Sequence, residues 1–260
     1  MTVAIVGGTG LCDLPGLELV REHVIDTPLG SPSAPIKEGR YHGCPVLFLP
    51  RHGADHTVAP HLINYRANIW ALKSLGVEHI VAVNAVGGIH PEAGPEALVI
   101  PDQIIDYSYG REHTFYTGEH VLSGQDLMGL SFAELEHVDF TFPYDETLRQ
   151  ELLLAAQSKS LLVFGEGVYG CTQGPRLETA AEVKRCKRDG CDVVGMTAMP
   201  EAALARELGI EYAAVCLSVN WGAGLVDELI TLDQIHSVVA SGMSKVESLL
   251  GAFLFRRAAG

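Results

Sequence analysis

The chain has 260 residues, of which 47% are hydrophobic and 28 are glycine. This length and composition suit one globular domain with a sizeable core, and we expect a single domain over residues 1–260. The formal net charge is −14, and the sequence lacks the basic stripe of a nucleic-acid-binding protein. We therefore expect no nucleic-acid partner, and a site for an anion must be built locally from backbone N–H groups and a few Arg or His side chains.

The N-terminus and the cysteines indicate the compartment. The first residues lack the basic segment and apolar run of a signal peptide, and we expect no segment that spans a bilayer. A cytoplasmic protein without a membrane partner follows as an expectation. The six cysteines form no Cys-x-x-Cys pair and are expected to be reduced core residues, although Cys186 and Cys191 are close enough in sequence to pair under oxidation.

Short β-branched runs that end at turns predict the strands of the first half of the chain. These strands are expected over residues 2–6, 46–49, 80–83, 98–101 and 104–106. The third is expected to end at Asn84, where the small residues 85–88 indicate a turn. Apolar residues at helical spacing predict a helix over residues 64–75, ended by Gly76.

The second half alternates strands with longer helical patterns. Residues 110–142 are irregular and indicate a functional loop, with a short helix near residues 132–136. Strands are then expected over residues 167–172, 192–196 and 212–219, and helices over residues 143–158, 177–189, 200–208 and 233–255, the last capped by Thr231 or Asp233. The alternation predicts an α/β fold, a three-layer αβα sandwich around a twisted, mixed and mostly parallel sheet.

A glycine turn follows the first predicted strand. In Gly7-Gly8-Thr9-Gly10, backbone N–H groups can converge on an anion and Thr9 adds a hydroxyl donor. The dinucleotide fingerprint requires a third glycine where this chain has Asp13, so NAD binding is weakly supported. The segment alone is equally compatible with a structural turn.

Arg51-His52 follows the second predicted strand, with His56 and His61 nearby. An arginine at a strand end can hold phosphate through its planar fork. A group of histidines is also compatible with a metal, but these lack the His-Glu-x-x-His spacing of a zinc site, and we expect no metal.

Further polar residues lie at the ends of other predicted strands. Asn84, Thr197 and Asn220 each suit a ligand contact, and each is also compatible with an ordinary turn or loop anchor. Met196 is equally compatible with core packing, and Glu178 with a first-turn residue that stabilises a helix dipole. Because ligands of open α/β sheets bind beyond the carboxyl ends of the strands, the set together predicts one site for an anion and an organic ligand.

Several motifs, spread in order over nearly the whole chain, resemble those of the trimeric purine nucleoside phosphorylases, and most closely their 5′-methylthionucleoside branch. They are Ile5-Val6-Gly7-Gly8-Thr9-Gly10-Leu11, Arg51-His52-Gly53, Asn64-Tyr65-Arg66-Ala67-Asn68-Ile69-Trp70-Ala71-Leu72, Asn84-Ala85-Val86-Gly87-Gly88, Gly174-Pro175-Arg176-Leu177-Glu178-Thr179 and Val194-Gly195-Met196-Thr197-Ala198-Met199-Pro200-Glu201. The resemblance implies a phosphorylase-like fold and a reversible phosphorolysis, in which phosphate displaces a purine from C1′ of a nucleoside. It implies no cofactor beyond phosphate as co-substrate, and a role in purine salvage.

The resemblance also assigns residues. The implied phosphate contacts are Thr9, Arg51, His52, Asn84, the backbone at Ala85, and Thr197. The implied base contacts are Asn220, Glu178 and Leu177, and the catalytic residues are Asn220, Thr197 and His52. Met196 matches the residue packed against the ribose, and His137 a residue lent to the 5′ end by a neighbouring subunit, which implies a homotrimer with sites at subunit interfaces.

Departures from the methylthioadenosine-cleaving relatives bear on the substrate. Asn220 and Glu178 stand where those relatives usually carry Asp and Ser, and they match the six-oxopurine enzymes. Leu232 and Ile235 match apolar residues of the methylthio branch and suit a methylthio group better than a hydroxyl, although they are also compatible with helix packing. We therefore expect S-methyl-5′-thioinosine as substrate, with 5′-methylthioadenosine or general six-oxopurine nucleoside phosphorolysis as alternatives.

Three other classes remain as rivals: an NAD-dependent dehydrogenase, a non-catalytic nucleoside-binding protein and a zinc hydrolase. None of them accounts for the motifs jointly. Residues 119–136 form a longer stretch than expected between the family's landmarks, and the sequence gives no account of it.

Overall fold

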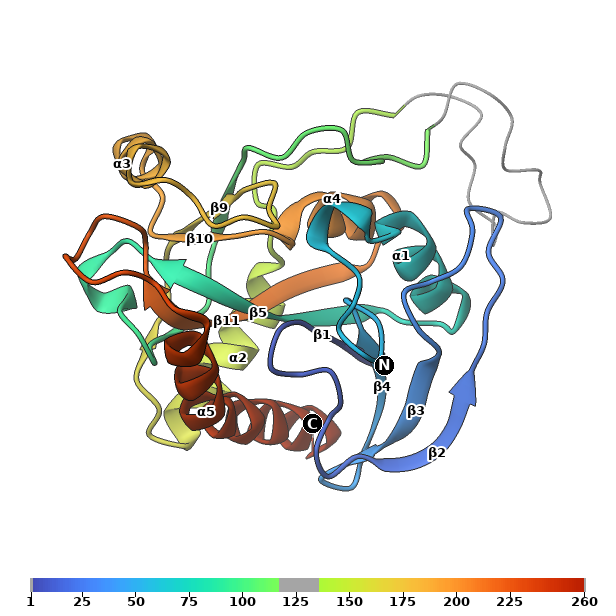
Figure 1. Cartoon of the computed structure of the whole chain (residues 1–260). Coiled ribbons are helices and arrows are strands. Elements are labelled where there is room, and N and C mark those ends of the chain that lie inside the picture. The colour runs from blue at the N-terminus through green and yellow to red at the C-terminus, as the bar shows by residue number, and fades with distance from the viewer. Residues whose placement is uncertain (1, 117–135, 260) are drawn as a thin grey trace.

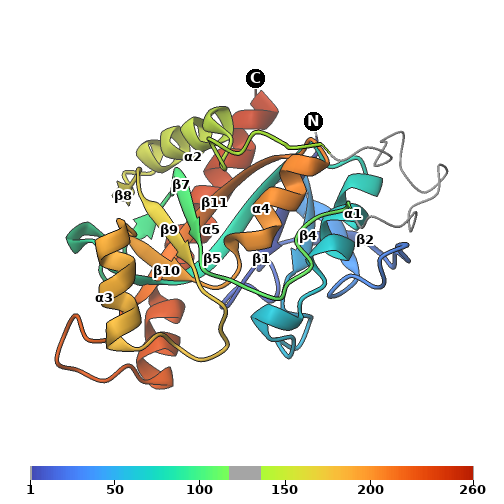
Figure 2. The same cartoon turned by 90° about the horizontal axis from the view of Figure 1, so that it is seen from above.

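The computed structural model describes residues 2–116 and 136–259. A central sheet is covered by helices on both faces (Figures 1 and 2). Helices α1 (Tyr65–Ser74) and α4 (Ala198–Glu207) pack on one face, and α2 (Glu146–Ser158) and α5 (Leu232–Ala259) on the other. Helix α3 (Ala180–Asp189) covers a smaller third cluster beside β10. The expected three-layer αβα sandwich is confirmed.

The sheet is mixed and mostly parallel, as predicted. Its main path runs β2-β3-β4-β1-β5-β10-β9-β7, and β11 joins it by pairing with β5. Strands β1, β4, β5 and β11 are parallel to their neighbours in this group, whereas β2, β3, β6 and β10 bring the antiparallel pairings. The strands are β1 Val3–Gly7, β2 Glu18–His23, β3 Ile36–Tyr41, β4 Cys44–Pro50, β5 His79–Gly88, β6 Leu98–Val99, β7 Gln103–Asp106, β8 Val163–Phe164, β9 Val168–Cys171, β10 Val193–Gly195 and β11 Glu211–Trp221.

Strand β5 is longer than predicted. It does not end at Asn84 but continues to Gly88, pairing with β11 throughout and with β10 at its end. The small residues that indicated a turn instead allow close packing around a strand. A Cβ added at Gly88 would lie 1.8 Å from the carbonyl oxygen of Ala93, which no side chain tolerates.

The sequence analysis missed β2, β3 and β8. Strand β2 is an exposed edge strand with the sequence ELVREH, whose charged residues hide the alternation that identifies a strand. Strand β8 has only two residues, too few for any periodicity.

Helices α2 and α3 start three residues later than predicted, whereas the starts of α4 and α5 agree with the prediction. Thr179 caps α3 and forms a capping box with Glu182, so Glu178 precedes the helix and the first-turn interpretation of that residue is wrong. Helix α4 includes Ala198, but Met199 is non-helical (φ −115°, ψ 138°), so its continuous part begins at Pro200, as predicted. Thr231 caps α5 as expected, accepting from the Gln234 N–H at 3.3 Å.

Helix α5 bears on the expectation that no segment spans a bilayer, which stays a prediction. Its residues Leu232–Ala258 are long and apolar enough for this by length and composition, and the most apolar 18-residue stretch among them has a mean hydropathy of 1.4. Half of that stretch is buried inside the protein, against α2 and β11. A core helix of a globular protein can be equally long and apolar.

The described flanks of the expected functional loop, residues 110–116 and 136–142, contain no helix or strand, which agrees with the prediction. The short helix expected near residues 132–136 lies almost entirely outside the described residues.

Candidate active site

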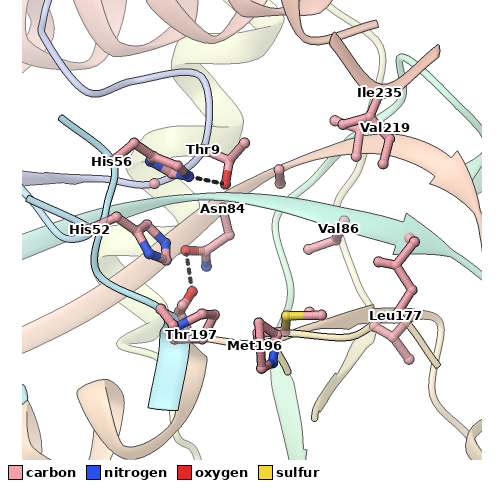
Figure 3. A pocket seen from close by; sticks show the side chains of 18 of the residues that line it. Thr9, His52, His56, Asn84, Val86, Leu177, Met196, Thr197, Val219 and Ile235 are labelled. Carbon is pink, nitrogen blue, oxygen red and sulfur yellow. Dashed lines mark hydrogen bonds between the residues drawn. The ribbon is translucent and has the colours of Figure 1, made fainter. Parts of the chain in front are cut away.

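A cavity of about 530 Å³ opens over the second half of β5. The turn after β1 and the loop after β4 form one side, and the segment before α3 and the first turn of α5 form the other. Strand β10 runs back along β5 and brings Thr197 beside Asn84. In Figure 3 the polar side chains of Thr9, His52, His56, Asn84 and Thr197 gather at one end, here called the anion end, and apolar side chains lie at the other.

His52 is a neutral acceptor at the anion end. Its Nδ1 lies 2.8 Å from the carbonyl oxygen of Val58 and donates to it, so the Nε2 lone pair is free. Burial, helped by the charge of Arg51, lowers the pKa of His52 to about 4. At neutral pH the ring is therefore uncharged, and Nε2 can accept a proton or a hydrogen bond from a protonated oxyanion.

Asn84 presents an unused donor. Its side chain is buried, and Oδ1 accepts from the Thr197 hydroxyl at 3.3 Å. Within the described residues, Asn84 Nδ2 has no hydrogen-bond partner. A buried donor left unpaired is costly, by about 1–3 kcal/mol. An anion in the cavity would relieve that cost, which supports the prediction for Asn84 and Thr197.

Arg51 is not where the sequence analysis placed it. Its guanidinium is fully buried and does not line the cavity. Nε and Nη2 donate to the two carboxylate oxygens of Glu201 at 2.6 and 2.7 Å, and Nη1 donates to the Val83 carbonyl at 3.2 Å. Burial alone would lower the pKa of Arg51, but the Glu201 carboxylate raises it above the ordinary value. The planar fork is therefore occupied by a carboxylate, and Arg51 lies beneath Gly8 as a fixed positive charge.

The opposite end of the cavity, here called the base end, is built by Asn220 at the end of β11 and by Leu177 and Glu178 before α3. Asn220 pairs with Gly87 across a register shift, and its Nδ2 donates to the Trp221 carbonyl at 2.7 Å, which fixes the amide. Glu178 accepts from the Thr172 hydroxyl at 2.5 Å through Oε1, leaving Oε2 free. Both side chains line the cavity. Asn220 and Glu178 thus bring an amide and a carboxylate to one cavity, and their contact with a purine base stays a prediction.

Met196 lies between the two ends, and the first turn of α5 forms a rim beside Val219 at the apolar end (Figure 3). A Cβ at Gly174 would lie 2.4 Å from the Met196 sulfur, so the thioether is packed tightly against the turn before α3. Leu232 and Ile235 line the cavity as predicted, with Leu232 largely exposed. His236 lies on the same rim and was missed, because no pattern distinguishes a single histidine within a predicted helix as a site residue.

Other members of the wall were also missed or misplaced. His56, which the sequence analysis weighed only as a metal ligand, lines the anion end, and its Nε2 lies 3.3 Å from the Thr9 hydroxyl. The sequence feature that could have identified His56 as a site residue is its position four residues after His52, in the loop that follows a strand. His137 is exposed and does not line this cavity, so its assignment to a neighbouring subunit's site stays a prediction.

The histidines of the loop after β4 give no support to a zinc site. Across residues 2–116 and 136–259, no three His, Cys, Asp or Glu side chains are arranged to hold a metal ion. All six cysteines are unpaired, and all but Cys12 are buried.

Residues 2–254 match the phosphorylase superfamily. The chain belongs to this superfamily. A Pseudomonas syringae protein named probable S-methyl-5′-thioinosine phosphorylase is 49% identical over 255 residues, which cover 98% of this chain and 99% of that protein. The 6-oxopurine nucleoside phosphorylase of Pyrococcus furiosus is 46% identical over 243 residues, 94% of this chain and 86% of that one.

Solved structures agree with the sequence relatives. The methylthioadenosine phosphorylase of Schistosoma mansoni in complex with adenine superimposes with a TM-score of 0.92 at 32% identity, covering 100% of this chain and 93% of the other. The phosphorylase-like fold expected from the motifs is therefore confirmed, and the protein is a pentosyltransferase of the nucleoside phosphorylase type.

Proposed function

We propose that the protein catalyses the phosphorolysis of S-methyl-5′-thioinosine to hypoxanthine and 5-methylthio-ribose 1-phosphate. The observation that carries this proposal is that Asn220 and Glu178 both line the base end of the cavity. The anion end of the same cavity offers uncharged hydrogen-bond donors and acceptors. The names of the Pseudomonas and Pyrococcus relatives support the six-oxopurine base, and the first also supports the methylthio group.

The geometry suits an in-line displacement. A phosphate oxygen bonds to C1′ as the C1′–N9 bond breaks, and the electron pair of that bond goes to the base. The ribosyl group passes through an oxocarbenium-like state, which the phosphate anion stabilises. Thr9, Asn84 and Thr197 would hold the phosphate in place, which supplies proximity.

The leaving base gains negative charge, and Asn220 is placed to meet it. Its amide nitrogen carries two protons, and the bond to Trp221 uses only one. The second can donate to N7, where charge develops. Glu178 Oε2 can accept from N1–H, a proton that hypoxanthine has and adenine lacks. Buried polar groups matched in this way can discriminate strongly between substrates.

The rim of α5 bears on the 5′ group. Leu232 and Ile235 offer apolar contacts to a methylthio group, but His236 adds an imidazole to the same rim. We expect His236→Leu to lower the rate with inosine and to leave the rate with S-methyl-5′-thioinosine nearly unchanged, because the imidazole can pair with a 5′-hydroxyl whereas sulfur is a weak acceptor. The ratio of the two specificity constants measures this, and an unchanged ratio would show that His236 does not face the 5′ group.

The assembly and the setting belong to the same proposal. We propose a homotrimer in which His137 of one subunit approaches the 5′ end of a neighbour's substrate, acting in purine salvage in the cytoplasm with phosphate as co-substrate and no other cofactor. The support is the exposure of His137, which leaves it accessible to a second copy of the chain.

Base release from four nucleosides, with and without phosphate, tests the reaction. The nucleosides are S-methyl-5′-thioinosine, 5′-methylthioadenosine, inosine and adenosine. We expect phosphate-dependent release that is fastest with the first. Equal rates with inosine would point to a general six-oxopurine phosphorylase, and a preference for 5′-methylthioadenosine would overturn the assignment of Asn220 and Glu178. Release without phosphate would contradict phosphorolysis itself.

A further inference from the structure

Three side chains at the anion end form a hydrogen-bonded series. Cys12 Sγ lies 3.3 Å from His56 Nδ1, and His56 Nε2 lies 3.3 Å from Thr9 Oγ1. Thr9 and His56 line the cavity, whereas Cys12 does not. Figure 3 shows the His56 ring aimed at the Thr9 hydroxyl. The thiol therefore reaches the cavity only through the histidine.

The protonation states of Cys12 and His56 limit which atoms can donate in these two hydrogen bonds. Burial raises the pKa of the Cys12 thiol, which keeps its proton at neutral pH. Burial also lowers the pKa of His56, so its ring is neutral and carries a single proton. A thiol can donate its S–H to Nδ1 or accept from Nδ1–H, and each bond is weak; donation to Nδ1 places the ring proton on Nε2.

We propose that Cys12 is a positioning residue for phosphate. By donating to His56 Nδ1 it keeps the ring proton on Nε2, which donates to Thr9 Oγ1 and leaves the Thr9 hydroxyl proton free for the phosphate. The inference rests on the proposed function, because the anion is taken to be the phosphate of that reaction.

The neighbouring histidine makes the arrangement chemically complementary. The His52 and His56 rings lie 4.6 Å apart, and His52 holds its proton on Nδ1 toward Val58. One ring thus offers a lone pair and the other, through Thr9, a hydroxyl donor. A monohydrogen phosphate has one P–OH to donate and several oxygens to accept. His52 protonated on Nδ1 and His56 protonated on Nε2 together match that ion, and Cys12 maintains the tautomer of His56.

Steady-state kinetics of Cys12→Ala and Cys12→Ser test the proposal. With saturating nucleoside, we expect Cys12→Ala to raise KM for phosphate about 3- to 10-fold, the size of one hydrogen bond's net contribution, with a smaller change in kcat. Cys12→Ser keeps a donor and should lie closer to the parent than Cys12→Ala. The matched control is Cys44→Ala, which removes a buried thiol from β4, away from the cavity, and should keep the parent's KM for phosphate.

The ¹⁵N resonances of the His56 ring, assigned with His56→Gln, test the same point without turnover. We expect the parent to carry the ring proton on Nε2 and Cys12→Ala to populate both tautomers. A parent ring protonated on Nδ1, or an unchanged KM in Cys12→Ala, overturns the role of Cys12 while phosphorolysis stands. Serine and alanine variants with equally raised KM would also overturn it, since the effect would then come from packing. If the parent released no base with phosphate, the proposed function would fail, and the ring resonances would still report whether Cys12 sets the tautomer.

Discussion

Asn220→Asp is expected to lower kcat/KM for S-methyl-5′-thioinosine by about 10²–10³-fold, the usual effect of losing one donor aimed at developing charge. In the parent, Asn220 gives one amide proton to the Trp221 carbonyl, and in the proposed reaction the other would donate to N7. An ionised aspartate has neither proton and suits a base whose N7 is itself protonated. We therefore expect the preference to shift toward 5′-methylthioadenosine, measured as the ratio of the two specificity constants.

Asn68→Asp is the matched control for this variant. Asn68 is a buried asparagine on α1 that bonds to Ser33 outside the cavity. The same chemical change there should lower stability and leave the ratio of the two specificity constants unaltered. If Asn220→Asp kept the parent's ratio, Asn220 would not be the residue that distinguishes the bases.

Glu201→Ala is expected to destabilise the protein by about 3–5 kcal/mol, because it leaves the charge of Arg51 buried without a partner. Neither side chain has access to water, and Tyr212 also loses the acceptor that lies 3.0 Å from its hydroxyl. For a domain of this size the loss corresponds to a fall in Tm of roughly 6–20 °C, which calorimetry can measure at a fixed protein concentration.

Lys245→Ala provides the comparison for the buried pair. It breaks the exposed ion pair with Glu96, and such pairs contribute about 0–1 kcal/mol. We expect its Tm to stay near that of the parent. The measurement is repeated in excess phosphate. If phosphate removed the difference in Tm between Glu201→Ala and the parent, the Arg51 side chain would have turned into the cavity. Its assignment as a fixed charge outside the cavity would then be wrong.

The strands that carry the site were predictable because their residues are unambiguous. Residues 2–6, 46–49 and 212–219 are apolar runs that end at polar or glycine-rich turns, and the structure places strands on all three. Strand β2 was missed because an edge strand faces water on the side where a pattern would show. Strand β3 lies inside the sheet and was missed because Lys37, Glu38 and Arg40 interrupt its apolar positions. Asn84 to Gly88 were misjudged as a turn because small residues favour turns and close packing alike.

Within the site, residue types were easier to predict than their directions. Asn84, Thr197, Asn220 and Glu178 line one cavity, as their places at strand ends and in the motifs suggested. Arg51 follows a strand too, but its partner Glu201 is 150 positions away, and no local pattern reveals that a distant carboxylate occupies the guanidinium. His56 and His236 reach the cavity through loop and helix geometry that only the folded chain specifies.

The continuous course of β5 limits how the enzyme can diverge. Asn84 at the anion end and Gly87, which opposes Asn220, belong to one hydrogen-bonded strand. Three residues of strand span about 10 Å, so the separation between the proposed phosphate and base contacts is set by a rigid length of backbone. Substitutions at either end can change which groups are recognised without altering that distance. Such a scaffold permits single substitutions to change which purine or which 5′ substituent is accepted, while the spacing along β5 stays constant.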